Sequence, residues 1–280
     1  TKTKCKSNFK IHELDGSRMI GFNALGQLGR LGNQMFQFAA LKGIARNNGY
    51  QFCFPPSSNE DEWKDHQLLI PFKLSSTNEL NIQYIDPDRP TVVESGFGFD
   101  QNLFNKCPDW VSVQGFFQTE KYFKNIKSEI KKDFIFRDDI RIPCEEMMSS
   151  IGDATALHIR RTDYITNPNH TCLSMDYYKK ALSYFDVGPV LIFSDDPDWC
   201  KEHELFEDDR FMISDSDDQY IDMCLMTKCT GHIIANSSFS WWGSWLSNSR
   251  KTIAPKGWFR GSNNEHLDTT DIYCSNWTLL

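Results

Sequence analysis

The second half of the chain repeats one hydrophobic and polar pattern three times: a short apolar run ends in a cluster of polar or charged residues. The runs are residues 157–159, 190–193 and 233–235, and the letters that follow them are RRTD, SDD and NSS. Short apolar runs of this kind are typical of buried parallel strands. The polar clusters begin 34 and 42 residues apart, roughly one βαβ unit each. We therefore expect them to line one edge of a parallel sheet, where α/β proteins bind ligands.

The first half opens with a predicted strand, a glycine-containing loop and a helix. Residues 19–22 are apolar, and residues 34–46 carry apolar side chains at helical spacing. The glycines between them, Gly26, Gly29 and Gly32, do not match the GxGxxG fingerprint, which weakens the case for a Rossmann oxidoreductase. Such a loop either lets a ligand or another backbone approach closely or forms a tight turn under the helix.

Further helices are predicted from the spacing of apolar residues. They cover residues 122–136, 175–185 and 219–227. Residues 137–151 are interpreted as a charged connector, so we expect a domain boundary near residues 140–153. Residues 50–112 contain several prolines between short apolar pieces and are expected to form variable loops.

Composition and charge argue against two classes of protein. The chain has 280 residues, 40% of them hydrophobic, which is enough for one large or two modest domains, and two are favoured. A net charge of -8 argues against a nucleic-acid partner, because binding to a phosphate backbone needs a basic face. The longest aliphatic runs are about four residues, far below the roughly 20 needed to cross a bilayer, so no membrane segment is predicted.

Compartment and cysteine chemistry stay open at this level. The chain opens at Thr1 rather than Met, so we expect a cytoplasmic protein if it is microbial or viral, or a Golgi-lumenal one if an anchor preceded this residue. The 9 cysteines lack metal-type spacing. Most are interpreted as buried thiols, with one or two disulfides as the alternative in a lumenal protein.

The densest basic cluster, Arg160 and Arg161, suits a small phosphorylated ligand. Alternate side chains of a strand share a face, which places His158 and Arg160 on the same side. Because the planar guanidinium matches a pair of phosphate oxygens, a pyrophosphate is the expected ligand. The alternative is a surface pair between Arg161 and Asp163, together with a buried histidine of purely structural use.

Ser194, Asp195 and Asp196 precede Pro197 and are typical of a helix N-cap. A cap explains one aspartate, and the second carboxylate is then free to accept the paired N–H donors of a guanine edge. Acidic clusters of this kind, like residues 215–218, also hold Mn²⁺ or Mg²⁺ in other folds. We interpret residues 215–218 as a solvated cap of the next helix and predict no metal site.

The third junction continues as NSSFSWWGSWL, which combines small polar residues with three tryptophans. The first three residues, Asn236, Ser237 and Ser238, are predicted to cap a helix whose free N–H groups face a phosphate. Phe239 and Ser240 are predicted to contact the ligand. At least two of the tryptophans are assigned to the core between sheet and helix.

Four segments together resemble the ordered motifs of the α-1,2-fucosyltransferases, glycosyltransferase family 11. They are GRLGNQMFQFA, HIRRTDY, FSDD and NSSFSWWGSWL, and the resemblance extends from residue 29 to about residue 277. The resemblance implies a GT-B-like fold in which two Rossmann-type domains face a central cleft. It further implies metal-independent, inverting transfer of L-fucose from GDP-β-L-fucose to O2 of a terminal galactose. The expected parts are an acceptor-side domain (1–145), a GDP-fucose-binding Rossmann-like domain (146–262) and a C-terminal segment (263–280). The C-terminal segment either stays with the second domain or packs back on the first.

The same resemblance implies roles for individual residues. Arg160 would contact the β-phosphate as a catalytic residue, with His158 and Arg161 holding the same strand end. The remaining donor contacts would come from Asp195 or Asp196 at the guanine, from Ser237, Ser238 and Phe239 at the pyrophosphate, and from Asn33 and Gln34 across the cleft.

Two departures from the motifs leave the catalytic base open. Thr162 stands where the family usually has glycine, and Pro168 stands where the related α-1,6 enzymes carry a glutamate. Asp163 is the predicted base, and the alternative is that it only holds Arg160 or Arg161. Two other functions also stay open: transfer from the same donor to another sugar hydroxyl or a protein hydroxyl, and a non-catalytic module that binds a glycan or nucleotide.

Overall fold

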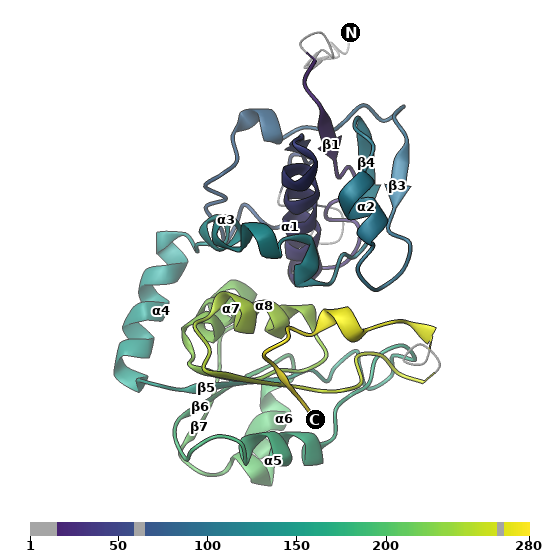
Figure 1. Cartoon of the computed structure of the whole chain (residues 1–280). Coiled ribbons are helices and arrows are strands. Elements are labelled where there is room, and N and C mark those ends of the chain that lie inside the picture. Colours follow the sequence, from purple (N-terminus) through teal and green to yellow (C-terminus); the bar gives the residue numbers. More distant parts are fainter. Residues whose placement is uncertain (1–15, 59–64, 262–265) are drawn as a thin grey trace, which may run out of the picture.

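The computed structural model describes residues 16–58, 65–261 and 266–280. These residues form two α/β units, one above the other in Figure 1. The first sheet has the order β2-β1-β4-β3 and comprises β1 (Met19–Gly21), β2 (Gln51–Cys53), β3 (Thr91–Val93) and β4 (Val111–Gln114). The second has the order β10-β9-β8-β5-β6-β7 and comprises β5 (Thr155–Ile159), β6 (Val190–Ser194), β7 (Phe211–Ile213), β8 (Gly231–Ile233), β9 (Lys251–Ala254) and β10 (Thr278–Leu279). Within the described residues, neighbouring strands of both sheets run parallel, which confirms the predicted α/β class.

Helices cover both faces of the second sheet. In Figure 1, α7 and α8 lie on the face toward the first unit, and α5 and α6 lie on the opposite face. The α-helices are α1 (Leu31–Asn48), α2 (Gln101–Lys106), α3 (Lys127–Asp133), α4 (Asp138–Ile151), α5 (Met175–Leu182), α6 (Pro197–Glu202), α7 (Gln219–Lys228) and α8 (Ser238–Leu246). Short 3₁₀ turns are η2 (Glu79–Asn81), η3 (Glu120–Tyr122), η4 (Lys124–Ile126), η5 (Glu204–Phe206) and η6 (Thr270–Ile272). Within the described residues, no helix is both long and apolar enough to span a bilayer.

The helix predicted over residues 122–136 is wrong. Only α3 is an α-helix there, and the two turns η3 and η4 precede it. Phe123, between the turns, has a φ of -137°. Its ring stacks on Trp242 at a centroid distance of 5.4 Å, so packing against the other unit overrides the helical spacing.

The charged connector predicted over residues 137–151 is also wrong, because this segment is helix α4. Ile140, Cys144 and Met148 are buried, and their spacing of four residues makes one face that packs against α7. The charged residues between them and Pro143 within the helix obscured this stripe in the sequence.

The two units share one hydrophobic core. The tryptophans of α8 do not lie mainly between sheet and helix, as expected, but pack against the first unit. Trp241 and Trp242 contact Phe36 of α1 at centroid distances of 4.4 and 4.9 Å, and Trp245 contacts Phe123 at 5.4 Å. All three indoles are buried, and Trp242 Nε1 donates to the Gly32 carbonyl at 3.0 Å. The start of α1 is thereby fixed against α8.

Gly32 is the point of closest approach between these helices. A Cβ atom at this position would lie 2.6 Å from Ser238 Oγ and 2.8 Å from the Phe239 nitrogen. The loop glycine thus allows another backbone to approach, one of the two alternatives left open by the sequence. Helix α1 also begins at Leu31, before the predicted start at residue 34, so Gly32 lies in its first turn.

The C-terminal segment contacts both units over its described residues 266–280. Strand β10 pairs with β9 of the second sheet. In η6, Asp271 accepts a hydrogen bond from the Phe99 nitrogen at 3.0 Å and pairs with Lys121, both in the first unit. This segment therefore reinforces the contact between the units.

We expect Gly32→Ala to lower the free energy of unfolding by about 1–3 kcal/mol, because the added methyl group forces the two helix starts apart. Gly188→Ala is the matched control, since nothing lies within 4 Å of a Cβ atom at Gly188. Urea denaturation of both variants measures the difference. Equal stability of the two variants would contradict the close approach.

Candidate active site

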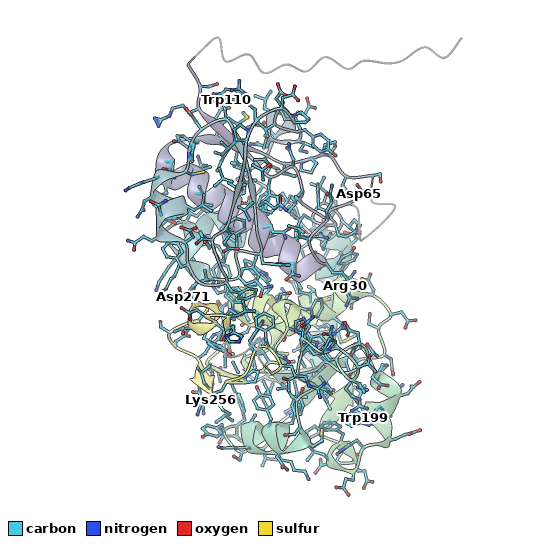
Figure 2. All side chains as sticks on the ribbon, turned by 90° about the vertical axis from the view of Figure 1, so that its right-hand side faces the viewer. Arg30, Asp65, Trp110, Trp199, Lys256 and Asp271 are labelled. Atoms are coloured by element: carbon cyan, nitrogen blue, oxygen red, sulfur yellow. The ribbon has the colours of Figure 1, made fainter. Side chains whose placement is uncertain are left out.

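A cavity of about 610 Å³ lies where the two units meet. Its walls come from the start of α1 and nearby loops of the first unit, and from the carboxyl ends of β5, β6 and β8 in the second. These strands are neighbours in the order β8-β5-β6, so the three predicted junctions do meet at one sheet edge. Figure 2 shows Arg30, which lines the cavity, at the level where the two units meet.

Arg160 lines the cavity with its guanidinium held by two carboxylates. Nη2 lies 2.6 Å from Asp163 Oδ1, and Nη1 lies 2.9 Å from Asp195 Oδ2. The guanidinium carbon also lies 5.3 Å from the centroid of the Tyr164 ring. Two contacts on different nitrogens fix the plane of the group, and a lysine could not reproduce them.

Asp195 and Asp196 are both used inside the protein, so the expected free carboxylate is not found at either position. Asp195 accepts from the nitrogens of Arg161 and Thr162 at 2.8 and 3.1 Å and from the Thr162 hydroxyl. Burial raises the pKa of Asp195, but these hydrogen bonds and the charge of Arg160 outweigh it and hold the pKa below its usual value. Asp196 caps α6, as predicted, and pairs with Arg161 Nε at 3.2 Å. Thr162 stands where the family motif has glycine, and its hydroxyl donates a hydrogen bond to Asp195.

Arg161 points away from the cavity. Its guanidinium carbon lies 3.8 Å from the centroid of the Trp199 ring, and the side chain is not part of the cavity lining. In Figure 2, Trp199 is labelled in the lower part of the second unit, below the level of Arg30. Both arginines follow the end of β5 at Ile159, and only Arg160 lines the cavity, so the expected contact of Arg161 with the ligand is not found.

His158 lines the cavity floor and is buried. Its Nδ1 lies 2.8 Å from Ser240 Oγ. Burial, with the charge of Arg160, lowers the pKa of His158 to about 3, so the ring is neutral at neutral pH. Ser240 lies behind this ring and is buried rather than exposed to the cavity, contrary to its expected ligand contact.

The start of α8 forms another wall. Ser237 caps the helix by accepting from the Phe239 nitrogen at 3.3 Å, and Ser238 lines the cavity beside them. Asn236 is buried and donates to the carbonyls of Trp258 and Thr171, while its Oδ1 has no partner among the described residues. The free N–H groups of a helix start favour an anion in this position.

Across the cavity, Asn33 and Gln34 have different uses. Asn33 lines the cavity and accepts from Gln118 Nε2 at 2.6 Å. Gln34 is buried outside the lining, where it donates to the Gly29 carbonyl and accepts from the Gln67 nitrogen. Gln34 therefore stabilises the loop before α1 and the segment at Gln67. The sequence predicted a ligand contact for Gln34, and the structure does not place it at the cavity. Ser194 lines the cavity and accepts from the Asp196 nitrogen at 3.0 Å.

Several lining residues were missed by sequence reasoning, and they lie at the two ends of the cavity. At the β7–α7 end are Ser216, Asp217, Gln219 and Asp222, and at the opposite end are Phe97, Phe116, Gln118, Asn167, His170, Trp258 and Phe259. Asp222 accepts from Ser214 Oγ at 2.6 Å, and burial raises its pKa to about 6. The sequence signal that could have identified Asp222 is its position one turn into the helix that follows the acidic run at 215–218.

Among the residues that the structure describes, no group of three or more His, Cys, Asp or Glu side chains is arranged to hold an ion. The carboxylates nearest Arg160 are instead engaged by Arg160 itself and by backbone nitrogens.

The sequence profile of Glycosyl transferase family 11 matches residues 3–280. The chain belongs to glycosyltransferase family 11. It is 29% identical to the O-antigen biosynthesis glycosyltransferase WbnK of Escherichia coli, over 85% of this chain and 95% of that protein. It is likewise 29% identical to an alpha-1,2-colitosyltransferase of Escherichia coli, over 90% of this chain and 96% of that protein. The galactoside alpha-(1,2)-fucosyltransferase 1 of Bos taurus is 23% identical, over 78% of this chain and 64% of that protein.

Two solved structures have a similar fold. The fucosyltransferase NodZ from Bradyrhizobium superposes with a TM-score of 0.51 at 15% identity, over 82% of this chain and 94% of that one. POFUT1 in complex with GDP gives a TM-score of 0.50 at 13% identity, over 86% and 98%. The expected GT-B-like fold of this glycosyltransferase is confirmed.

Proposed function

We propose that the protein transfers L-fucose from GDP-β-L-fucose to O2 of a terminal β-galactoside, giving Fuc-α1,2-Gal with inversion. The observation that carries the proposal is the cavity in which the fixed guanidinium of Arg160 and the start of α8 converge. POFUT1, whose fold is similar, has been solved in complex with GDP-fucose. The names of the Escherichia coli and Bos taurus relatives support an α-1,2 linkage.

The cavity suits departure of a nucleoside diphosphate. As O2 of the acceptor attacks the anomeric carbon, the bond from that carbon to the β-phosphate oxygen breaks, and GDP leaves with additional negative charge. Arg160 and the N–H groups at the start of α8 are positioned to stabilise that charge without a cation. We propose on this basis that transfer is metal-independent.

The proton of the acceptor hydroxyl must leave as the new bond forms. Asp163 was the predicted base, but its Oδ1 is occupied by Arg160 at 2.6 Å. This contact supports the alternative in which Asp163 holds Arg160. Asp163 is half exposed, and its Oδ2 is not the oxygen that pairs with Arg160. We propose that this oxygen accepts the proton of the acceptor hydroxyl.

Asp222 is the best candidate for the guanine contact. Asp195 and Asp196 are engaged by the protein, whereas Asp222 lines the cavity and has one oxygen bonded to Ser214. A carboxylate with an available oxygen can accept N–H donors of a guanine edge. The nucleotide base would then lie at the β7–α7 end of the cavity, with its diphosphate toward Arg160.

The first test is an assay of the purified protein with GDP-β-L-fucose and a panel of β-galactosides in excess EDTA. We expect an α1,2-linked product by NMR, formed at the same rate with and without the chelator. A β-linked product or a covalent fucosyl-enzyme would contradict inversion. Loss of activity in EDTA that Mn²⁺ or Mg²⁺ restores would contradict metal independence. One Escherichia coli relative is named a colitosyltransferase, so a parallel reaction with GDP-colitose tests a second donor. Reactions with other sugar or protein hydroxyls test the alternative acceptors.

We expect Arg160→Lys to lower kcat by about 10² or more, because a point charge cannot make both carboxylate contacts and still face the leaving group. Arg250→Lys, at an exposed ion pair with Asp153, is the matched control and should be unchanged. Steady-state kinetics with both substrates measure the effect. An Arg160→Lys enzyme within a few-fold of wild type would exclude this role.

We expect Asp222→Asn to weaken GDP binding about 10- to 100-fold at pH 7.5, because an amide cannot act as a charged acceptor. The pKa of Asp222 is raised to about 6, so wild-type affinity for GDP should fall as the pH drops below about 6 and the carboxyl group is protonated. Asp222→Asn should lack this fall, and the exposed Asp176→Asn should behave as wild type. Calorimetric titration at several pH values measures all three. Equal affinity and pH dependence in Asp222→Asn and wild type would refute the contact.

A further inference from the structure

Five aromatic rings form a continuous row along the cavity wall. In order they are Phe116, Phe97, Phe259, His170 and Tyr164, and all five line the cavity. Successive ring centroids are 6.3, 4.8, 5.5 and 4.6 Å apart. We call these residues the aromatic row.

The aromatic row leads from the surface to the reacting centre. Phe116, at one end, is 40% exposed, whereas Tyr164, at the other end, is 8% exposed and lies beneath the Arg160 guanidinium. The nucleotide end proposed above, near Asp222, is at the other side of Arg160 along the sheet edge, since β6 and β7 lie on one side of β5 and β9 on the other. A molecule on the row would approach the anomeric carbon without crossing the nucleotide.

Polar atoms accompany the row. Gln118 Oε1 and His170 Nδ1 are buried and have no hydrogen-bond partner within the described parts of the chain. Burial lowers the pKa of His170; Arg160 also lowers it, whereas Asp163 raises it. Buried polar atoms usually have partners, so two such atoms on residues that line one wall point to a ligand with hydroxyl groups.

Glu94 holds the outer end of the row in place. Its Oε2 accepts from the nitrogens of Phe116 and Phe117 at 3.0 and 2.9 Å, and its Oε1 accepts from the Tyr122 hydroxyl at 3.1 Å. Phe117 has a φ of +53°, a strained value for a residue with a Cβ atom. The two successive N–H groups on one carboxylate stabilise this conformation and direct Phe116 to the cavity.

We propose that the aromatic row is the acceptor subsite and that it binds a galacto-configured pyranoside through the apolar face formed by C3, C4 and C5. The axial O4 of galactose leaves these C–H groups together on one face, which can pack on aromatic rings, while its hydroxyls can reach Gln118 and His170. This inference rests on the proposed fucosyl transfer. Because Phe116 and Phe97 belong to the first unit and the other rings to the second, the subsite exists only where the units meet.

The test separates acceptor binding from donor binding. We expect Phe97→Leu and Phe259→Leu to raise KM for a β-galactoside about tenfold, because each loses a ring of the aromatic row. KM for GDP-fucose, and the slow hydrolysis of GDP-fucose without acceptor, should change less than about twofold. Phe211→Leu, in β7 and outside the cavity lining, is the matched control.

The outcomes distinguish this inference from the proposed function. An unchanged galactoside KM in both leucine variants would overturn the acceptor subsite, and so would a parallel rise in the donor KM, which would place the donor on the row. Absence of any turnover of GDP-fucose by the wild-type protein would instead overturn the proposed function.

A second measurement needs no variant. Saturation-transfer NMR on the wild-type protein with GDP and methyl β-galactoside should show the strongest transfer to H3, H4 and H5 of the sugar. Methyl β-glucoside, whose equatorial O4 interrupts that face, should show weaker transfer. Uniform transfer over all galactoside protons would count against the aromatic row as the binding surface.

Discussion

The structure depends above all on the packing of α8 against the start of α1. Trp241 and Trp242 contact Phe36, and the Trp242 indole donates to the Gly32 carbonyl. Large aromatic side chains bury about 150–250 Å² each, which is the scale of a domain core and not of a weak contact between domains. The cavity lies directly beside this contact, so the same packing that joins the units also fixes the distance between its opposing walls.

The charged groups of the cavity are held in place within the second unit. Arg160 is paired with Asp163 and Asp195, and Asp195 is further stabilised by backbone nitrogens of the same turn. A cation held in this way cannot move to meet a ligand, and it loses little entropy when a phosphate arrives. The arrangement favours stabilisation of charge that develops during reaction over simple attraction of an anion.

The sequence correctly predicted that the three junctions after β5, β6 and β8 meet at one edge of a sheet. Apolar runs that end in polar clusters are a direct sign of buried strands. The sequence could not predict which carboxylates are occupied, since the partners of Asp195 come from a segment 33 to 34 residues away. Gln34 and Ser240 were expected at the ligand and are buried instead, because only tertiary packing decides which face of a helix start meets a cavity. The helix α4 was missed because its buried face has only one apolar or cysteine side chain in every four residues. Arg161 was likewise expected at the ligand, and its guanidinium packs on Trp199 instead.

The two ends of the cavity are lined by different kinds of chain segment. This difference affects how specificity for an acceptor can change. The end where we propose that the nucleotide binds is lined by residues that follow β6 and by the β7–α7 region, and both strands carry core residues of the second unit. Phe97 and Phe116 at the other end stand on loops next to β3 and β4 of the first unit. Loops tolerate substitution better than sheet elements, so the residues at the proposed acceptor end can change while Arg160 and its partners stay in place. Glu94 limits that freedom, since it accepts from the backbone nitrogens of Phe116 and Phe117 and is itself held by the Tyr122 hydroxyl. A change of acceptor is therefore expected to alter the rings of these loops before it alters the carboxylate that supports them.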